Sequence, residues 1–535
     1  MKRLISLILT VLLLTLGTAY AGTLMPYPKF QAFDSAGAPL VGGKVYTYIT
    51  GTSTAKASYS DRACTTPNTN PVVLDADGEA TIYLLGSYKI ILKTAADASI
   101  WTIDGVEGMG DPSAGGYYAD YNETDQGATG FGASVKAFVD TIGTDTGTIV
   151  LSHNSGGATT TYTFSTSETI PANITLKFER GAIIAIDTGI TVTINGSLDV
   201  GVYQIFSGVG VVALAGGYVS EIFPEWWGGG VGGVIDNYAA FKTIAALISS
   251  GYSGSVIYQT GTYLIDQVRT AANGITDILI TGGKGFILLG NNTVFEVAGD
   301  FVRTARTDAT VTPLAFNGCS YFTVSGIELD GNNASITIGG QTESLYNEGG
   351  YGIQIVNSNN YTFQRMNVHN FISDGLFERG HISNSNINKN GTYISSQFNL
   401  NGRNNLTIVQ AVNLTFLSCD FNEVGTTAYT YHSPGAGIDI EPTSDIATEK
   451  TGNITFINCN SLDNIRRAFI ATRPSRTENV TLIGFRSNNP NDYAYPFTSL
   501  VKNISYNNCV IDTGAGDFLP AGLGGGDFTD RSSEP

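Results

Sequence analysis

Two carboxylates lie two residues apart in the phrase Gly437-Ile-Asp-Ile-Glu-Pro442, and this spacing could support acid–base chemistry. If Ile438 and Ile440 point into a core, Asp439 and Glu441 share the opposite face of one strand. Their separation along the strand would be roughly 6.6–6.8 Å, at the lower edge of the ~6.5–9.5 Å expected of an inverting acid and base. We predict Asp439 and Glu441 as catalytic residues, with a solvated strand face as the alternative.

Asp374 is a third candidate catalytic carboxylate, because it would stand at the entry of a neighbouring strand. Asp before Gly is also common in turns. Aromatic rings stack on sugar faces, acids accept hydrogen bonds from hydroxyls, and Arg pairs with a uronate carboxylate. Side chains of these types near the carboxylates are predicted to bind substrate. They are Arg379, Tyr429, Tyr431, His432 and Arg473.

The five Cys and four His show no spacing typical of a metal site, and the Cys count is odd. Calcium needs several clustered oxygen ligands, which the acids could supply, but no spacing singles out a set. We therefore expect no metal and no cofactor, with calcium as the alternative.

The chain is acidic, with 28 Lys and Arg against 46 Asp and Glu and a net charge of −18. This balance argues against a nucleic-acid partner, because phosphates require a basic surface. We expect a polysaccharide as the partner. An acidic glycan could bind only where positive side chains locally reverse the negative electrostatic potential of the chain. Three residues that could do so, Arg466, Arg467 and Arg473, follow the candidate acid pair in the sequence.

A repeat from about residue 320 supplies the elements that would position these residues. Each copy has a lead residue, apolar residues at +1 and +3, and a small or apolar residue at +6. The step of two predicts a strand with alternate residues inward, and the step of three predicts a bend. Intervals of about 24 residues suit one coil of a parallel β-helix, with longer intervals as inserted loops. The leads are Asn360, Asn413, Asn453, Asn479 and Asn503, with weaker copies led by Tyr321 and Arg379.

Asn and Cys occupy fixed places in this repeat. Thirty of the 40 Asn lie beyond residue 316. Asn tolerates turn geometry and can form hydrogen-bonded ladders between coils, so we predict stacked Asn at the turns. Cys419, Cys459 and Cys509 share the +6 position and are predicted to be small buried residues rather than disulfide partners.

Residues 221–266 contain Glu225-Trp-Trp-Gly228, an amphipathic stretch over 236–248, and Gly261-Thr-Tyr-Leu-Ile265. In this order they resemble the entry segment of the pectate-lyase-like β-helix superfamily. We predict a helix that is capped by Asp236 and covers the open end of the β-helix. The resemblance implies an all-β protein, a right-handed parallel β-helix that acts on polysaccharide as a glycoside hydrolase or polysaccharide lyase.

Residues 24–106 read as a small all-β module with turns at Asp34-Ser-Ala-Gly37 and Asp75-Ala-Asp-Gly78. The stretch from Lys29 to Tyr48, together with Ile100-Trp-Thr-Ile-Asp104, resembles the attachment domain of phage tail fibres and tailspikes. That resemblance implies a spike on a phage-derived particle, with a homotrimer as the expected assembly.

The first 21 residues read as a secretory signal, with Lys2 and Arg3, an apolar run over 4–16, and small residues before position 22. An uncleaved anchor is the alternative. We predict a secreted, extracellular protein with no transmembrane segment in the mature chain, and a phage-derived particle as the alternative location.

The predicted order along the chain has six parts. They are a signal peptide (1–21), an N-terminal β domain (22–106), a linker with a short helix at 134–142 (107–147), a β-rich collar or first coils (148–220), the β-helix (221–515) and a loose tail (516–535). Three functions remain open at this point: a polysaccharide-degrading enzyme, a non-catalytic glycan-binding or adhesive spike, and a tailspike-like structural protein.

Overall fold

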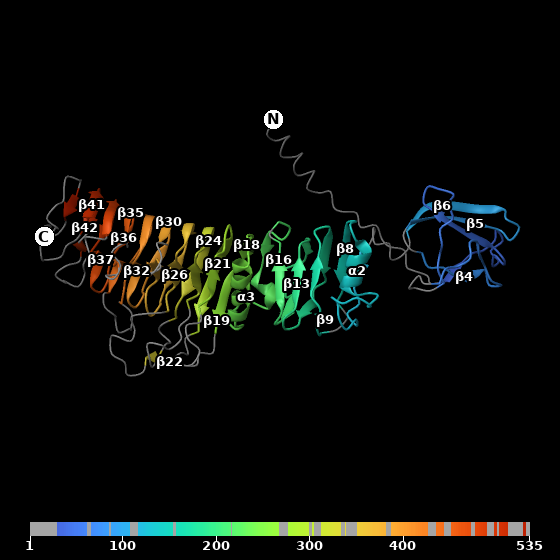
Figure 1. Ribbon diagram of the computed structural model, residues 1–535, viewed down its shortest axis with the longest axis horizontal. Helices are drawn as coiled ribbons and strands as arrows, with labels where there is room; N and C mark the ends of the chain where they lie inside the picture. The colour runs from blue at the N-terminus through green and yellow to red at the C-terminus, as the bar shows by residue number, and fades with distance from the viewer. Residues whose placement is uncertain are drawn as a thin grey trace, which may run out of the picture. The chain divides into compact units, whose positions relative to one another are not determined.

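Two structural units make up the computed structural model of this chain, Met1–Tyr117 and Tyr118–Pro535. Figure 1 shows the first unit in blue and the second from cyan to red. The described residues are 29–60, 66–84, 87–107, 116–153, 157–215, 217–266, 277–298, 302–303, 312–332, 337–338, 350–380, 387–425, 435–442, 451–471, 477–488, 497–499, 502–511 and 528–530. The predicted signal peptide, 1–21, lies outside them. In this part of the chain no helix is long and apolar enough to cross a membrane.

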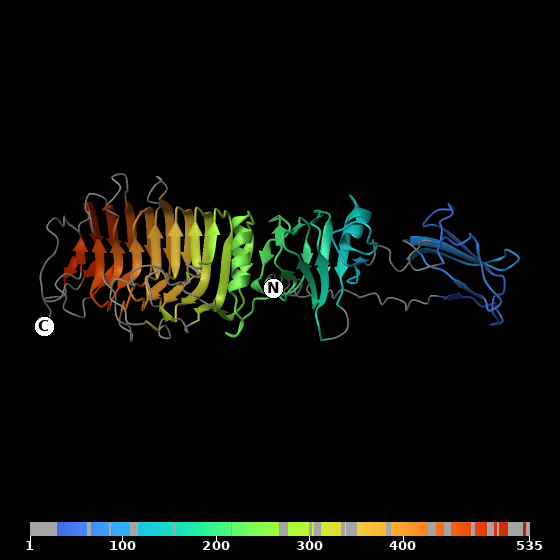
Figure 2. The ribbon, with the colours of Figure 1, turned by 60° about the horizontal axis from the view of Figure 1, so that its bottom comes forward.

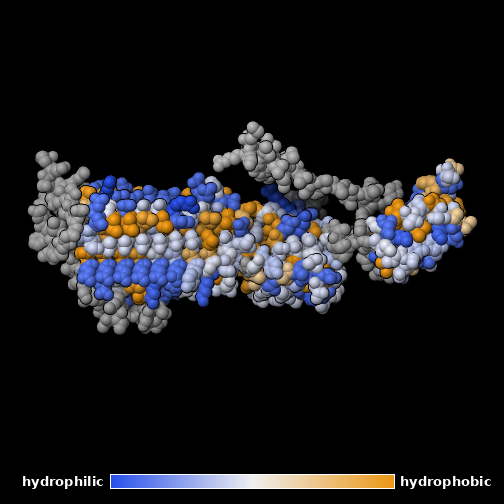
Figure 3. All heavy atoms as spheres, turned by 90° about the horizontal axis from the view of Figure 1, so that it is seen from above, coloured by the Kyte–Doolittle hydropathy of each residue, from blue (hydrophilic) through white to orange (hydrophobic). Residues whose placement is uncertain are grey.

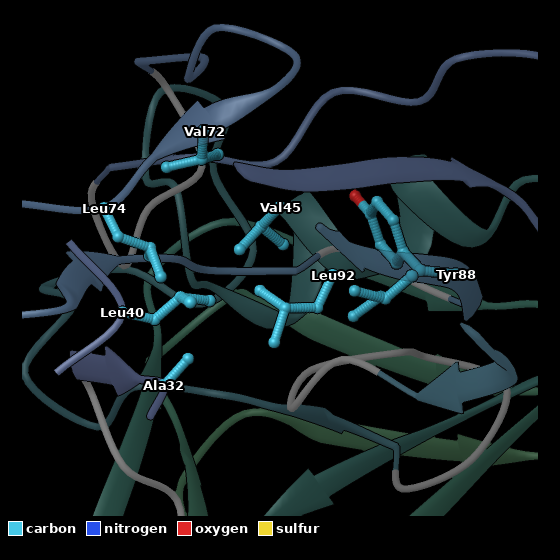
Figure 4. Close-up of a cluster of buried hydrophobic side chains, with 8 residues drawn as sticks. Ala32, Leu40, Val45, Val72, Leu74, Tyr88 and Leu92 are labelled. Carbon is cyan, nitrogen blue, oxygen red and sulfur yellow. The ribbon is translucent and has the colours of Figure 1, made fainter. Parts of the chain in front are cut away.

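The first unit is a small antiparallel β domain. Its main sheet has the strand order β3-β2-β5-β6, and β1 pairs with β4 beside it. Alternate residues of β2 and β5 point into one apolar core, where Val45, Tyr88 and Leu92 are almost fully buried (Figure 4). The strands are β1 (Lys29–Gln31), β2 (Lys44–Ile49), β3 (Val72–Val73), β4 (Glu79–Thr81), β5 (Ser87–Lys93) and β6 (Ser99–Glu107).

Both predicted turns of this unit are confirmed. Asp34 Oδ1 accepts hydrogen bonds from the backbone N–H groups of Ala36 and Ala38, each at 2.9 Å. Asp75 Oδ1 accepts from Asp77 and Glu79 in the same way, also at 2.9 Å. An Asp that closes its own turn explains why these positions carry Asp.

The second unit begins with three small parallel sheets. From β8 onward, each strand belongs to a different sheet from the strand before it, so every third strand returns to the same sheet. The strand orders are β14-β11-β8-β7, β15-β12-β9 and β10-β13-β16. The predicted short helix is α2 (Val135–Ile142), and the Ser134 hydroxyl caps it by accepting from Ala137 N at 3.2 Å. The strands are β7 (Tyr117–Tyr118), β8 (Gly147–Leu151), β9 (Thr160–Phe164), β10 (Glu168–Ile170), β11 (Ile174–Phe178), β12 (Ala182–Ile186), β13 (Thr191–Ile194), β14 (Leu198–Asp199), β15 (Phe206–Gly208) and β16 (Val211–Leu214).

The larger part of this unit is a parallel β-helix with two long sheets, so the predicted parallel β-helix after a small N-terminal β domain is confirmed. Figure 2 shows its strands stacked side by side. The long sheet contains β17 (Glu221–Ile222), β18 (Ser255–Ile257), β19 (Gly261–Ile265), β21 (Ile287–Val297), β24 (Ser320–Asp330), β27 (Asn359–Gln364), β28 (Asn367–His369), β30 (Asn388–Ile394), β31 (Gln397–Asn399), β33 (Ala411–Leu417), β35 (Thr451–Ile457), β38 (Thr477–Ile483) and β41 (Lys502–Asn507).

A second sheet of eight strands carries the candidate acids. It contains β20 (Leu279–Thr281), β23 (Leu314–Asn317), β26 (Ile353–Val356), β29 (Leu376–Arg379), β32 (Asn404–Ile408), β34 (Ala436–Ile440), β37 (Arg467–Ala471) and β40 (Phe497–Ser499). The remaining strands are β22 (Val302–Arg303), β25 (Thr337–Ile338), β36 (Asn460–Ser461), β39 (Arg486–Ser487), β42 (Cys509–Ile511) and β43 (Phe528–Asp530).

The predicted Asn ladder is present, with one lead corrected. Each ladder Asn has a positive φ between 53° and 63°, and each one after Asn360 donates its side-chain N–H to the Asn of the preceding coil at 2.9–3.1 Å. Arg379 is wrong as a lead, because it ends β29 in the other sheet; Asn390 takes that place. The ladder runs Asn360, Asn390, Asn413, Asn453, Asn479 and Asn503.

Rows of like residues run along the outer face of the long sheet beside this ladder. Thr362, Thr392, Thr415, Thr455 and Thr481 occupy one register position on successive strands. Figure 3 shows such rows as parallel bands of like hydropathy along this unit. A repeat of one residue type therefore becomes a stripe on the surface.

The interior of the β-helix is a stack of aromatic and small side chains. Tyr393, Phe416 and Phe456 lie face to face, with ring centroids 4.7 and 4.8 Å apart. The predicted burial of Cys419, Cys459 and Cys509 is confirmed, and none of the three forms a disulfide.

Helix α3 (Tyr238–Ser249) confirms the predicted amphipathic helix but differs in its start. Asn237 is the N-cap residue, whereas Asp236 Oδ1 accepts from Tyr238 N and from Asp266 N at 2.9 and 3.0 Å. Asp236 thus ties the start of the helix to the chain after β19. The helix contacts β16 on one side and β20 on the other, so it lies between the first coils and the main β-helix (Figure 1). The 3-10 helix η1 (Pro224–Trp227) packs against it.

Candidate functional site

Strand β34, the sixth strand of the eight-stranded sheet, carries Asp439, and Glu441 follows directly after its end. The strand pairs in parallel with β32 on one side and β37 on the other. The predicted inward orientation of Ile438 and Ile440 is confirmed, because both are fully buried in register with the interior residues Leu406 and Ile408. Asp439 therefore points to the outer side of the sheet, in register with Thr407.

Asp439 is nevertheless almost fully buried, with 2% of its surface exposed. Its Oδ2 accepts a weak hydrogen bond from Asn404 Nδ2 at 3.3 Å. Its Oδ1 has no hydrogen-bond partner among the described residues. Burial, reinforced by the negative charge of Glu441, raises the pKa of Asp439 to about 8. The carboxyl is therefore protonated at neutral pH, with one oxygen unengaged.

Glu441 follows two residues later and is exposed to solvent. Its backbone N–H donates to Ile408 O at 2.9 Å, which holds it in line with the strand. The two carboxylates thus share one side of the chain but stand in different environments. An exposed carboxyl group two residues from a buried one whose pKa is raised is the kind of asymmetry that acid–base catalysis requires.

Asp374 and Arg403 form a buried ion pair next to this strand. Arg403 Nε and Nη2 donate to the two carboxylate oxygens of Asp374 at 2.7 and 2.6 Å, and Asn404 N donates to Oδ1 at 3.2 Å. Asp374 is fully buried and both of its oxygens are engaged. Burial alone would lower the pKa of Arg403, but the charge of Asp374 raises it above its ordinary value.

Asn404 links the ion pair to Asp439. Its side chain donates to Thr407 Oγ1 at 2.9 Å as well as to Asp439, and its Oδ1 accepts from Ala436 N at 2.9 Å. The charge of Arg403 lowers the pKa of Asp439, against the larger effect of burial. These contacts fix the orientation of Asp439 and moderate its pKa.

An apolar cluster lies on the same outer side of the sheet, two strands from Asp439. Phe377 is in register with Thr407, and Thr407 is in register with Asp439. The ring of Tyr351 stacks on Phe377 at 4.5 Å with an interplanar angle of 5°. Val409 completes the cluster. All three side chains are buried, so the cluster is a small apolar core on the outer side of the sheet near Asp439.

The predicted substrate-binding residues are only partly described. Arg379 ends β29 half-buried, in register with Val356, on the same side of the sheet as Phe377. The other four predicted residues lie outside the described residues. They are Tyr429, Tyr431, His432 and Arg473.

Asn404 contacts both Asp374 and Asp439, and Glu441 follows Asp439 by two residues; sequence reasoning missed Arg403 and Asn404. The misplaced lead at Arg379 concealed a coil of 30 residues, the interval from Asn360 to Asn390. The same interval separates Asp374 from Asn404, which stack on adjacent strands. A correct lead would therefore have placed Arg403 beside Asp374.

Glu378 is a second buried carboxylate, and it points into the β-helix. It lies in register with Ile355 and Ile408 and is fully buried. It accepts hydrogen bonds from the hydroxyl of Tyr361 at 2.8 and 3.0 Å, from the hydroxyl of Tyr393, and from Asn388 Nδ2. Burial raises its pKa to about 7, although these donors lower it.

Within the described residues, no group of three or more His, Cys, Asp and Glu side chains is arranged to hold a metal ion. Asp374 is paired with Arg403, and Asp439 accepts a hydrogen bond from the amide of Asn404. Calcium therefore stays an untested alternative, and nothing in this part of the chain requires it.

No protein-family model matches the chain, and no curated relative matches it in sequence. Solved structures resemble it in fold. The A-module of the mannuronan C-5 epimerase AlgE6 of Azotobacter vinelandii is 16% identical over 55% of this chain and 70% of its own, with a TM-score of 0.36.

Two further structures have similar scores. The tailspike protein gp49 of Acinetobacter baumannii bacteriophage Fri1, a capsular polysaccharide depolymerase, is 15% identical over 58% of this chain and 54% of its own, with a TM-score of 0.33. The pectate lyase Pel9A is 13% identical over 78% of this chain and 80% of its own, with a TM-score of 0.27. Each likeness concerns the fold, which the strand order and register define independently.

Proposed function

We propose that this protein cleaves a polysaccharide on the outer side of the eight-stranded sheet, with Asp439 as the proton donor. One observation carries the proposal. Asp439 is a buried carboxyl with a pKa of about 8 and an unengaged oxygen, beside the exposed carboxylate of Glu441. A neutral acid at pH 7 can protonate the oxygen of a glycosidic bond.

The second carboxylate gives the proposal its reaction class. In a hydrolase, Glu441 would take a proton from water as that water attacks the sugar carbon, while Asp439 protonates the leaving oxygen. The bond between the sugar carbon and the bridging oxygen then breaks, and both products keep intact rings. In a lyase, a base would remove the proton beside a uronate carboxylate instead. Among the described residues that contact Asp374 or Asp439 there is no Lys, which favours hydrolysis.

The deciding experiment incubates the purified protein with a panel of neutral and acidic polysaccharides. Reducing ends report hydrolysis, and the absorbance of unsaturated uronates reports a lyase. We expect Asp439→Asn to lower the rate about 10²–10⁴-fold, which is the usual contribution of a general acid. Thr455→Val, on the outer face of the long sheet and away from Asp439, is the matched control.

The alternative is a glycan-binding or adhesive spike without catalysis. A polysaccharide that the protein binds but never shortens would support that alternative and overturn the enzymatic proposal. Full activity of Asp439→Asn and Glu441→Gln would retain the enzyme but reject this site.

Export is part of the same proposal, because a polysaccharide substrate is outside the cell. Mass spectrometry of protein recovered from the medium tests it, with an N-terminus at residue 22 expected. An uncleaved chain confined to the cell, or incorporated in phage particles, would favour the phage-derived alternative.

A further inference from the structure

We propose that a notch on the long sheet binds a negatively charged sugar residue, such as a hexuronate, away from the strand that carries Asp439. The notch has a volume of about 540 Å³. This lies within the ~300–1,000 Å³ typical of small-molecule sites. The residues that the proposal uses are Gly290, Asn291, Gly326, Glu328, Arg365 and Asn367.

A change of register between β21 and β24 makes the notch. Leu289 pairs with Ser325 and Thr293 with Ile327, so three residues of β21 stand opposite the single residue Gly326. Asn291 lies in the extra loop and forms one wall. Such a bulge bends the strand and turns its side chains outward.

Two glycines form the floor of the notch. Gly326 has a φ of +69°, and a Cβ at this position would stand 2.4 Å from Gly290 O. A Cβ at Gly290 would stand 2.8 Å from Gly326 O. Side chains at either position would fill the notch and clash with the backbone, so the glycines keep it open.

Arg365 supplies a positive charge at this notch. It has a positive φ of 52° on the next coil, and its Nη2 donates to Ser325 Oγ at 2.9 Å. No carboxylate among the described residues pairs with it, although the chain carries a net charge of −18. An exposed guanidinium that lacks a carboxylate partner suits a carboxylate on a ligand.

Glu328 and Asn367 supply groups for sugar hydroxyls. They stand in register on adjacent strands. Glu328 Oε1 lies 3.0 Å from Nε2 of His369, which holds the carboxylate in place. A carboxylate accepts hydrogen bonds from hydroxyls, and an amide both donates and accepts. Arg365 with these two groups fits a sugar that carries both a carboxylate and hydroxyls.

The saccharide class of the ligand rests on the proposed function, whereas the notch itself does not. The test therefore measures binding to the full chain carrying Asp439→Asn, so that turnover cannot interfere. The probes are glucuronate, glucose and inorganic phosphate. Their binding is measured by calorimetry or by ligand-observed NMR.

We expect glucuronate to bind at least tenfold more tightly than glucose and phosphate. Arg365→Gln should lower glucuronate affinity at least tenfold, because it removes the charge-assisted hydrogen bonds to the ligand carboxylate. Arg365→Lys should retain part of the affinity, and Asn367→Leu should weaken binding of both sugars.

Equal affinity for glucuronate and glucose, or no effect of Arg365→Gln, would overturn the notch proposal. Equal affinity for phosphate and glucuronate would reduce the notch to a simple anion site and also overturn it. If the chain binds glucuronate at the notch but cleaves no glycan, only the proposed function fails. The two failures are therefore distinguishable.

Discussion

At the residue scale, Asp439 and Glu441 show how one strand gives two carboxyl groups different properties. They are two residues apart, yet Asp439 is buried and Glu441 is exposed. Burial disfavours the charged form of Asp439, and the charge of Glu441 adds to that effect. The chemistry therefore depends on what surrounds each carboxyl group as well as on their spacing.

The coupling between these two acids gives a prediction for pH. Glu441→Gln removes a negative charge that raises the pKa of Asp439, so the pKa should fall below its value of about 8. Carbon-13 NMR of labelled aspartate carboxyl groups measures it, with Asp439→Asn identifying the signal. An unchanged or higher pKa would contradict the electrostatic account.

The ion pair of Asp374 and Arg403 gives a second prediction at this scale. Arg403→Met leaves the fully buried Asp374 without its cation, so the free energy of unfolding should fall by about 3–5 kcal/mol. Denaturant unfolding measures the loss. The double variant Asp374→Asn with Arg403→Met should recover part of it, because no buried charge then remains alone. A double variant as unstable as Arg403→Met would argue against the ion pair as the cause.

Glu378 predicts how stability depends on pH. Its folded-state pKa of about 7 lies above the ordinary value of 4.5. Its contribution to stability is therefore fully present below pH 4.5 and is lost as the pH rises through 7, by about 3 kcal/mol. The free energy of unfolding at pH 4.5 and pH 8 is compared between the unmodified chain and Glu378→Gln, because Asp439 also titrates in this range and contributes to both chains. Glu378→Gln should show a pH-dependent loss smaller by about this amount, and Glu221→Gln, at an exposed position on β17, should not.

At the scale of elements, the Asn ladder fixes the spacing of successive coils. Each Asn satisfies two demands, the positive φ of a turn and a hydrogen bond to the next coil. Asn is suited to both, because it tolerates the left-handed region and its amide both donates and accepts. The same residue type therefore recurs where the coil geometry recurs.

Two substitutions at one ladder position should separate these demands. Asn453→Ala loses both ladder hydrogen bonds and strains a φ of 53°, so it should lower the free energy of unfolding by about 2 kcal/mol. Asn453→Gly loses the bonds but relieves the strain, so its effect should be about half as large. Equal effects would show that backbone strain plays no part.

At the scale of the whole molecule, the homotrimer stays a prediction that light scattering can test. The chain mass is 56.5 kDa before any processing. A particle of about three times the chain mass would support the trimer, and a monomeric mass would contradict it. Repeating the measurement at high salt is the control, because screening weakens the repulsion expected of an acidic chain.

The sequence by itself determined the fold class, the spacing of most coils, the ladder Asn and the buried Cys. These features can be predicted locally, because the strand period and the turn geometry depend on residues that are close together in the sequence. It also indicated the acid pair on β34. The sequence reasoning misplaced one lead at Arg379. Loops of different lengths interrupt the coils, so the interval between leads does not show where each new coil begins.

Only the tertiary structure decided that Asp439 is buried and protonated, and that Arg403 and Asn404 stand beside it. Arg403 and Asn404 are about 30 residues from Asp374 and about 35 from Asp439 in the chain, and parallel stacking brings them together. A pKa depends on the charges and solvent around a group in space. Those neighbours come from other coils. Spacing along the sequence could therefore identify the candidate acids but could not assign their protonation states.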